Sequence, residues 1–240
     1  MLGDVHGNAV ALAAVLEELR GEQVELVVWT GDLTWGHEPR ATVDLVRSVE
    51  IPSRFVRGNA ERALLELREC GSEEASERER WMLASHAPSD LALLRSFAHA
   101  HSVEIEGLGA VYFTHGSPRS DEELLTAGTP EARVRAATAD IAERVLVTGH
   151  THSQYDREVA GVRAVNPGSV GLPYEGRPGA YWALLGPGVE HRRTDYDLDA
   201  AELRIRAGSN AFAELTMGLL RKPPSRLEAI EHAEGRVFSG

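Results

Sequence analysis

The chain has 240 residues, 42% of them hydrophobic, and carries a formal net charge of −12 at pH 7. This length suffices for one domain with a substantial core, and no apolar run reaches the ~20 residues of a transmembrane helix. The negative charge argues against broad binding to duplex nucleic acid, because affinity for a polyanion comes mainly from Lys and Arg. The N-terminus lacks the pattern of a signal peptide, and the single cysteine, Cys70, suits a reducing compartment. We therefore expect a soluble, cytoplasmic protein without a membrane partner.

The first sixty residues alternate between helical and strand-like patterns. Apolar residues recur at helical spacing from Ala9 to Arg20, whereas the short apolar run at 26–29 is typical of a strand buried on both faces. Pro39 begins the next helix, because proline is favoured in the first helical turn. The predicted elements are, in order, helix 9–20, strand 26–29, a helix from Pro39 and strand 55–56. This alternation favours an α/β architecture.

The rest of the chain predicts one catalytic domain and a helical tail. The predicted elements are helical residues 60–99, strands 103–105, 111–113 and 145–147, a helix over roughly 130–143, and a mostly helical tail from Asp199. Short β-type runs from 156 to 193 predict a second, antiparallel sheet. We expect a catalytic domain at 1–195, with a helical insertion at about 60–100, and a C-terminal extension at 196–240. The Glu- and Arg-rich run at 66–80 is interpreted as solvent-exposed helix faces.

Side chains that can bind metal ions follow several predicted strands. Active sites in α/β proteins gather at the carboxyl ends of strands, because the loops there converge. The candidate ligands are Asp4, His6, Asp32, Asn59, His115, His150 and His152. Carboxylate, imidazole and amide ligands suit Mn²⁺, Fe²⁺, Zn²⁺, Ni²⁺ or Co²⁺, and the absence of thiolates disfavours a structural zinc site.

The spacing around these ligands has a physical reason. Glycine precedes Asp32, Asn59 and His150, where it permits a sharp turn and a close approach of the backbone. In the Asp-x-His and His-x-His pairs, extended backbone is expected to place both side chains on one side of the chain. Two bound cations would also make the pocket locally positive despite the net charge of −12.

In this order, the motifs resemble those of calcineurin-like metallophosphoesterases, in the small bacterial branch of phosphodiesterases and phosphatases. The matching motifs are Gly3-Asp4-Val5-His6-Gly7-Asn8, Gly31-Asp32, Arg57-Gly58-Asn59, His115-Gly116-Ser117-Pro118, Gly149-His150-Thr151-His152 and Asn166-Pro167-Gly168-Ser169. The similarity runs from about Gly3 to Leu185, and the ordered set is far more specific than one Asp-x-His motif. The resemblance implies a four-layer α/β/β/α sandwich.

The same resemblance implies a dinuclear metal-dependent phosphoester hydrolase. The implied ligand sets are Asp4, His6 and His152 for one ion, Asn59, His115 and His150 for the other, and Asp32 as the bridge. A metal-bridging hydroxide would attack phosphorus in line, with Asp32, Asn59 and His115 as the catalytic core. We expect two divalent ions, Mn²⁺ before Fe, Ni, Zn or Co. The substrate would be a small phosphodiester, phosphomonoester or nucleotide.

The sequence allows two roles for several residues. The resemblance places Asn8 near the substrate phosphate, but an asparagine after glycine is equally a helix cap. Arg57 either contacts phosphate or pairs with a surface carboxylate, and the surface pair is favoured. Asn166 and Gly168 are expected to shape a turn that supports the histidine loop at 150–152. The histidines interpreted as surface or structural, with His37 as the first exception to consider, are His37, His86, His99, His101, His191 and His232.

Two positions depart from the family pattern. Only Met1 and Leu2 precede Gly3, so the strand expected before the first aspartate is nearly absent, and its neighbours would keep unpaired backbone groups. We interpret this as a late-called start or a truncated chain, and expect looser metal binding at Asp4. Ala60 stands where many family members carry a histidine that protonates the leaving group.

Two classes of function are open. The first is a metallophosphoesterase, and the second is a scaffold or binding protein that keeps the fold without turnover, as in the retromer subunit that resembles this family. Scaffold versions tend to lose ligands, and none is missing here, so the enzyme is favoured. The sequence does not separate phosphodiesterase from phosphatase, and it allows a homo-oligomer.

Overall fold

The computed structural model describes residues 1–71, 74–208 and 213–236. The helices are α1 (Ala9–Leu19), α2 (Pro39–Arg47), α3 (Asn59–Cys70), α4 (Glu77–Ala84), α5 (Pro88–Arg95), α6 (Glu131–Ala137), α7 (Leu198–Ala207), α8 (Ala213–Arg221) and α9 (Arg226–Glu234). The strands are β1 (Val27–Trp29), β2 (Ser53–Phe55), β3 (Ala100–Ile105), β4 (Gly109–Thr114), β5 (Val145–Val147), β6 (Tyr155–Val159), β7 (Val162–Asn166), β8 (Ala180–Leu185) and β9 (Val189–Thr194). Residues 72–73 of the predicted charged run, and 209–212 and 237–240 of the predicted extension, lie outside the described ranges.

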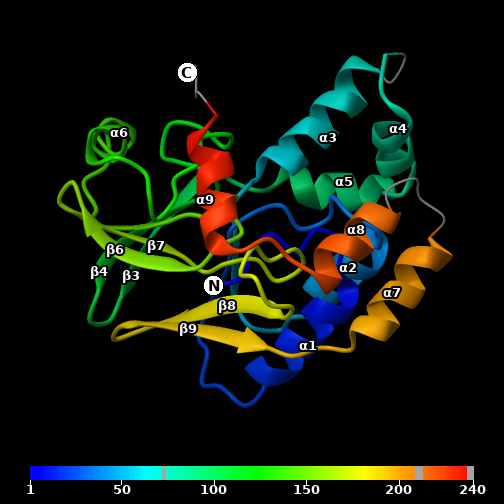
Figure 1. Ribbon diagram of the computed structural model, residues 1–240, viewed down its shortest axis with the longest axis horizontal. Helices are drawn as coiled ribbons and strands as arrows, with labels where there is room; N and C mark the ends of the chain where they lie inside the picture. Colours follow the sequence, from blue (N-terminus) through cyan, green and yellow to red (C-terminus); the bar gives the residue numbers. More distant parts are fainter. Residues whose placement is uncertain (72–73, 209–212, 237–240) are drawn as a thin grey trace.

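The strands form two layers. In one layer, β1 pairs in parallel with β2, and residues 1–2 link this pair to the β8-β9 hairpin. The other layer is a five-stranded mixed sheet of order β3-β4-β5-β7-β6, in which β4, β5 and β7 are parallel. Figure 1 shows the two layers with helices on their outer sides. This arrangement is the predicted four-layer α/β/β/α sandwich.

Alternating side chains along single strands connect the four layers. Val28 of β1 and Val147 of β5 belong to the apolar cluster between the two sheets. Trp29, the next residue of β1, points the other way and packs with α1 and α5. Leu146 of β5 likewise points outward, toward α6. The sheets are therefore apolar on both faces, as the continuous apolar runs predicted.

Two predictions about the elements were wrong in part. β6 and β7 do not form a separate antiparallel sheet with β8 and β9, because β7 pairs in parallel with β5 and joins the five-stranded sheet. Periodicity along the chain gives no information about such distant partners. The predicted helix over 130–143 ends at Ala137, where the Thr138 hydroxyl donates to Val134 O at 2.9 Å. This local bond competes with continuation of the helix.

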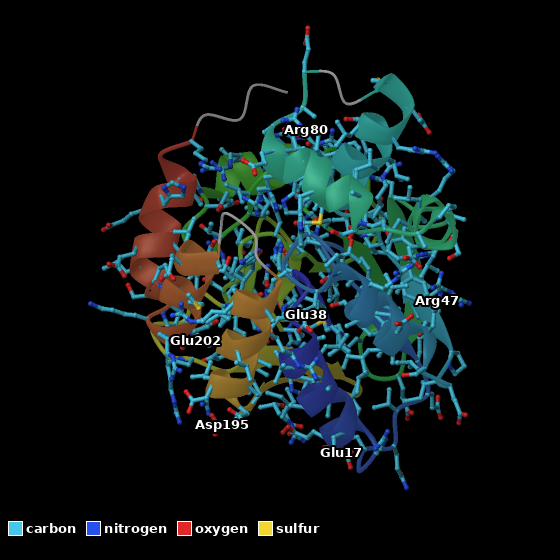
Figure 2. All side chains as sticks on the ribbon, turned by 90° about the vertical axis from the view of Figure 1, so that its right-hand side faces the viewer. Glu17, Glu38, Arg47, Arg80, Asp195 and Glu202 are labelled. Carbon is cyan, nitrogen blue, oxygen red and sulfur yellow. The ribbon has the colours of Figure 1, made fainter. Side chains whose placement is uncertain are left out.

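The C-terminal helices pack against the rest of the chain. Arg204 of α7 lies 3.2 Å from the carboxylate of Glu38, the residue that precedes α2. Figure 2 labels Glu38 and also Glu202, which lies two residues before Arg204 on α7. Throughout the described ranges, no helix combines the length and the apolar character that crossing a membrane requires.

Met1 and Leu2 occupy the position of the strand that was expected to be nearly absent. Leu2 donates its N–H to Val28 O at 2.9 Å and accepts from Thr30 N at 2.8 Å. Met1 O accepts from Ala183 N at 3.2 Å, and the buried amino group of Met1 donates to Ala183 O at 2.7 Å. Two residues therefore satisfy backbone groups on both neighbours, and the expectation of unpaired groups beside this position was wrong.

Candidate metal centre

Six of the predicted ligands form two groups of converging side chains. In the first group, the Nε2 atoms of His6 and His152 lie 3.0 Å apart. His152 Nε2 lies 3.4 Å from Asp4 Oδ1. Asp4 and His6 follow the β-bridge that Leu2 forms with Trp29, and His152 follows β5. Their donor atoms are close enough to share one ion.

The second group contains Asp32, His115 and His150. His115 Nε2 lies 3.2 Å from His150 Nδ1 and 3.5 Å from Asp32 Oδ1. Asn59, the seventh predicted ligand, places its Oδ1 3.0 Å from His115 Nε2. The second oxygen of Asp32 lies 3.7 Å from His6 Nε2, so this carboxylate faces both groups. The structure thus brings all seven residues together, while their role as ligands stays a prediction.

A backbone carbonyl orients each imidazole from its far side. The pairs are His6 Nδ1 with Trp35 O at 3.1 Å, His115 Nδ1 with Thr30 O at 2.7 Å, His152 Nδ1 with Leu172 O at 2.7 Å, and His150 Nε2 with Glu122 O at 3.3 Å. A ring N–H that donates to a carbonyl leaves the opposite nitrogen to a metal ion. The carbonyls therefore aim four ring nitrogens into the cluster.

Five of these ligands have left-handed backbone. The φ angles are 50° at Asp4, 47° at His6, 54° at Asp32, 65° at His150 and 57° at His152. The expectation of extended backbone in the Asp-x-His and His-x-His pairs was therefore wrong. Such residues cost of order 1 kcal/mol or more each, and surrounding bonds must hold them. Asp4 N donates to Gly31 O at 2.9 Å, and His6 N donates to Asp32 O at 3.0 Å.

Glycines let the backbone approach the two carboxylates. A Cβ atom on Gly58 would lie 2.1 Å from Asp32 Oδ1, and one on Gly149 would lie 2.8 Å from Asp4 Oδ2. The space freed at Gly149 lets the N–H of His150 donate to Asp4 Oδ2 at 3.1 Å. The predicted close approach is confirmed at these two positions.

Glu61 is a buried carboxylate that the sequence analysis did not assign to the site. It is 1% exposed and accepts the N–H groups of Asp32, Leu33 and Gly58 at 2.9, 2.7 and 2.8 Å. Burial, and after it the charge of Asp32, raises the pKa of Glu61 to about 7. Glu61 ties the loop of Asp32 to the start of α3, where Asn59 lies. The sequence contained a signal for the bond between Glu61 and Gly58, because a glutamate three residues after a helix cap is typical of a capping box.

Asn166 supports the histidine loop, as predicted. Its Nδ2 donates to Gly149 O at 2.6 Å and to Thr151 Oγ1 at 3.1 Å, and its Oδ1 accepts from Gly168 N at 2.8 Å. The side chain is fully buried. This prediction is confirmed.

The two substrate-binding candidates have different surroundings. Asn8 caps α1, because its Oδ1 accepts from Ala11 N at 3.1 Å, and its Nδ2 donates to Gly171 O at 3.1 Å. The cap is confirmed, and contact with substrate stays a prediction. Arg57 forms no ion pair with another described residue, so the favoured surface pair is not found there, and its buried Nε has no hydrogen-bond partner.

Charge is distributed unevenly among His6, His115 and His150. Burial lowers the pKa of His6, and it lowers the pKa of His150 to about 4 with help from His115. Burial also disfavours charge on His115, but the Asp32 carboxylate outweighs it and raises the pKa of His115 to about 10. Burial would raise the pKa of Asp32, but the neighbouring His115 outweighs this effect and holds the pKa well below its usual range. The metal-free cluster therefore holds a proton on His115.

The donor set fits divalent metal ions. Four imidazoles, two carboxylates and one amide oxygen converge, their outer atoms are fixed by the backbone, and the one cysteine of the chain, Cys70, is exposed outside the cluster. Borderline divalent ions such as Mn²⁺, Fe²⁺ and Zn²⁺ match such nitrogen and oxygen ligands.

Comparison with known proteins identifies the family. The calcineurin-like phosphoesterase superfamily domain matches residues 1–185, and the chain belongs to this superfamily. A metallophosphoesterase from Sphaerobacter thermophilus is similar in structure, with 25% identity, a TM-score of 0.70, and coverage of 91% of this chain and 97% of that one. A hypothetical protein from Pyrococcus horikoshii OT3 shares the fold at 19% identity, with a TM-score of 0.80. The match covers 93% of this chain and 97% of that one. No curated protein sequence matches.

The proton on His115 predicts that metal binding depends on pH. A metal ligand must be unprotonated, so binding displaces this proton, whereas His6 and His150 are already neutral at pH 7. Affinity for Mn²⁺ should rise about tenfold per pH unit between pH 7 and 9. Calorimetric titration with Mn²⁺ in buffers of different ionisation enthalpy should give a release of about one proton. Binding without proton release would contradict this distribution of charge.

Proposed function

We propose that the protein is a dinuclear metal-dependent phosphoester hydrolase acting on a small phosphodiester, phosphomonoester or nucleotide. The observation that carries the proposal is the position of Asp32, whose two oxygens face the two histidine groups at 3.5 and 3.7 Å. A carboxylate shared in this way would serve both metal ions of a two-metal hydrolase. We also propose Mn²⁺ as the metal and the cytoplasm as the compartment.

The residues of the chain prepare the site before substrate arrives. When bound, the two metal ions supply Lewis acidity and lower the pKa of water. Asp32 and Asp4 provide the negative charge that retains these ions in a buried place. Carbonyls fix the imidazoles, and Glu61 fixes the loop of Asp32 against the start of α3. Because the ligands are held in advance, little reorganisation is needed during the reaction.

The test compares two variants. Asp32→Asn removes a proposed metal ligand, and His37→Ala removes a buried histidine that is not one. His37 belongs to neither ligand group, and its ring nitrogens have no hydrogen-bond partner among the described residues. Asp32→Asn should lower turnover of a phosphoester panel with Mn²⁺ by at least about 100-fold, or roughly 3 kcal/mol of barrier. His37→Ala should leave most of the activity.

The controls are the stoichiometry of bound Mn²⁺ and the circular dichroism spectrum of each variant. Equal losses of activity in two folded variants would show that the ligand assignment is wrong. Two bound metal ions without turnover on any ester of the panel would favour the scaffold class instead.

Ala60 gives a second prediction, about the leaving group. Its N–H donates to Asp32 Oδ1 at 2.9 Å, but its methyl side chain cannot donate a proton to a departing oxygen. A general acid typically contributes ~10²–10⁴-fold. Esters whose leaving groups are stable as anions should therefore react about 100-fold faster than esters of poor leaving groups.

Initial rates across a series of substituted aryl phosphates and diesters measure this dependence. Rates should rise steeply as the pKa of the leaving group falls, and Ala60→His should flatten the slope if the new imidazole reaches the site. A flat series in the unmodified protein, with chemistry rate-limiting, would refute the missing acid.

A further inference from the structure

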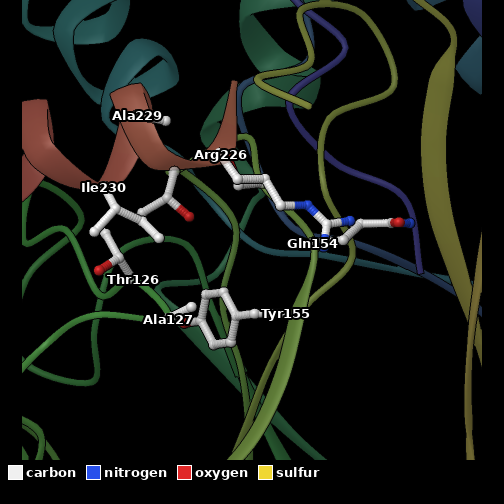
Figure 3. A pocket seen from close by; sticks show the side chains of 9 residues that line it. Thr126, Ala127, Gln154, Tyr155, Arg226, Ala229 and Ile230 are labelled. Atoms are coloured by element: carbon white, nitrogen blue, oxygen red, sulfur yellow. The ribbon is translucent and has the colours of Figure 1, made fainter. Parts of the chain in front are cut away.

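Helix α9 lies outside the family domain, which ends at residue 185, yet it packs over the loop that follows the metal-site histidines. Ala229 and Ile230 of α9 cover Thr151, Ser153 and Tyr155 across a small cavity. Figure 3 shows this cavity, with Arg226 extending from the start of α9 toward Gln154. Its volume is small, about 20 Å³. The contact between helix and loop is therefore close.

Polar contacts fix the far end of α9. The Glu234 carboxylate accepts from the hydroxyls of Thr126 and Thr129 at 2.7 and 2.6 Å. Arg133 lies 3.1 Å from the same carboxylate. These bonds determine where the helix ends relative to the segment before α6, and they leave its first turn to face the metal-site loops.

At the near end, Arg226 forms an ion pair with Glu175. The Glu175 side chain is 3% exposed, whereas Arg226 is 54% exposed. The other oxygen of Glu175 accepts the N–H of Gln154 at 2.5 Å. Gly176 adds a backbone bond to Pro224 O at 2.8 Å. A buried carboxylate thus joins the first turn of α9 to a backbone group two residues beyond His152.

Tyr174 connects this carboxylate to the histidine itself. Its N–H donates to His152 O at 2.9 Å, and its ring lies against the His152 imidazole with centroids 4.7 Å apart. Its carbonyl accepts from Ser153 Oγ at 2.8 Å. The segments 152–154 and 174–175 are therefore joined at three successive points. Displacement of Glu175 would be transmitted to the ring of His152.

We propose that the Arg226–Glu175 ion pair positions His152 for metal binding, so that the C-terminal helix α9 is a working part of the metal centre. This inference rests on the proposed function in one respect, since it takes the cluster to bind metal. The ion pair acts through the loop, and Arg226 is a positioning residue that touches neither metal nor substrate. Without the guanidinium, the buried Glu175 carboxylate loses its cation, and the loop must move to bring it to water.

The test uses Arg226→Met in the full chain, because methionine keeps an unbranched apolar side chain beside the cavity and removes the guanidinium with its charge and N–H donors. The matched control is Arg221→Met, which removes ion pairs with Asp199 and Glu202 elsewhere in the extension. Arg226→Lys should restore the positive charge and most of the function. After removal of metal by chelation, each protein is titrated with Mn²⁺ by calorimetry.

Arg226→Met should weaken one of the two Mn²⁺ binding steps about 10- to 100-fold, the loss typical of residues that orient metal ligands. The Mn²⁺ affinity of the other binding step should change by less than about threefold in Arg226→Met. Both affinities should change by less than about threefold in Arg221→Met and Arg226→Lys. A second readout needs no metal, because the Nδ1–H of His152 donates to Leu172 O and gives an imidazole proton signal in NMR spectra. Among the metal-free proteins, this signal should broaden only in Arg226→Met.

The outcomes separate the two proposals. Unchanged Mn²⁺ affinities and an unchanged His152 signal in Arg226→Met would overturn the positioning role, as would equal losses in Arg221→Met. If the unmodified protein binds no Mn²⁺, the proposed function fails, and the imidazole signal still decides whether α9 positions His152.

Discussion

Burial of two carboxylates beside four imidazoles is the constraint on which the rest of the structure depends. Asp4 is fully buried and Asp32 is 4% exposed, and a buried charge is stable only with partners. The protein supplies two kinds of partner, the His115 imidazolium and backbone N–H groups such as those of Ala60 and His150. These donors come from different strand ends. The sandwich therefore has to close at one edge before either carboxylate is stabilised.

The sequence predicted which residues meet better than it predicted how they meet. Strand ends followed by Asp32 or His150 are visible as local patterns, and the layers follow from apolar runs such as 145–147. Left-handed backbone at five ligands was not predictable, because it is imposed by bonds between loops distant in sequence. The same reason applies to β7, whose partner is set by the sheet. It also applies to the bonds of Glu61 with Asp32 and Leu33, because the capping pattern predicts only its bond with Gly58.

The C-terminal extension shows the same limit. Its helices were predictable from composition and from the proline pair before α9, but their contacts were not. A few charged residues decide the docking, such as Arg226 with Glu175 and Glu234 with Arg133. Charges of both signs are abundant in this chain, with 25 Lys and Arg and 37 Asp and Glu. Composition therefore cannot select the pairs, and only the folded geometry does.

The surroundings of the site also decide where its positive charge comes from. Arg62, on α3 next to the cluster, is held by Asp121 at 2.8 Å and by Glu122. Arg226 and Arg133 are likewise paired with carboxylates. These three guanidinium groups are neutralised by the protein itself, and the chain as a whole is acidic. In the proposed reaction, attraction of a phosphoester would then fall to Arg57, which forms no ion pair with another described residue, and above all to the metal ions, because two divalent cations outweigh the charge of two carboxylates. Loading with metal would in that case create the anion site as well as the catalytic one.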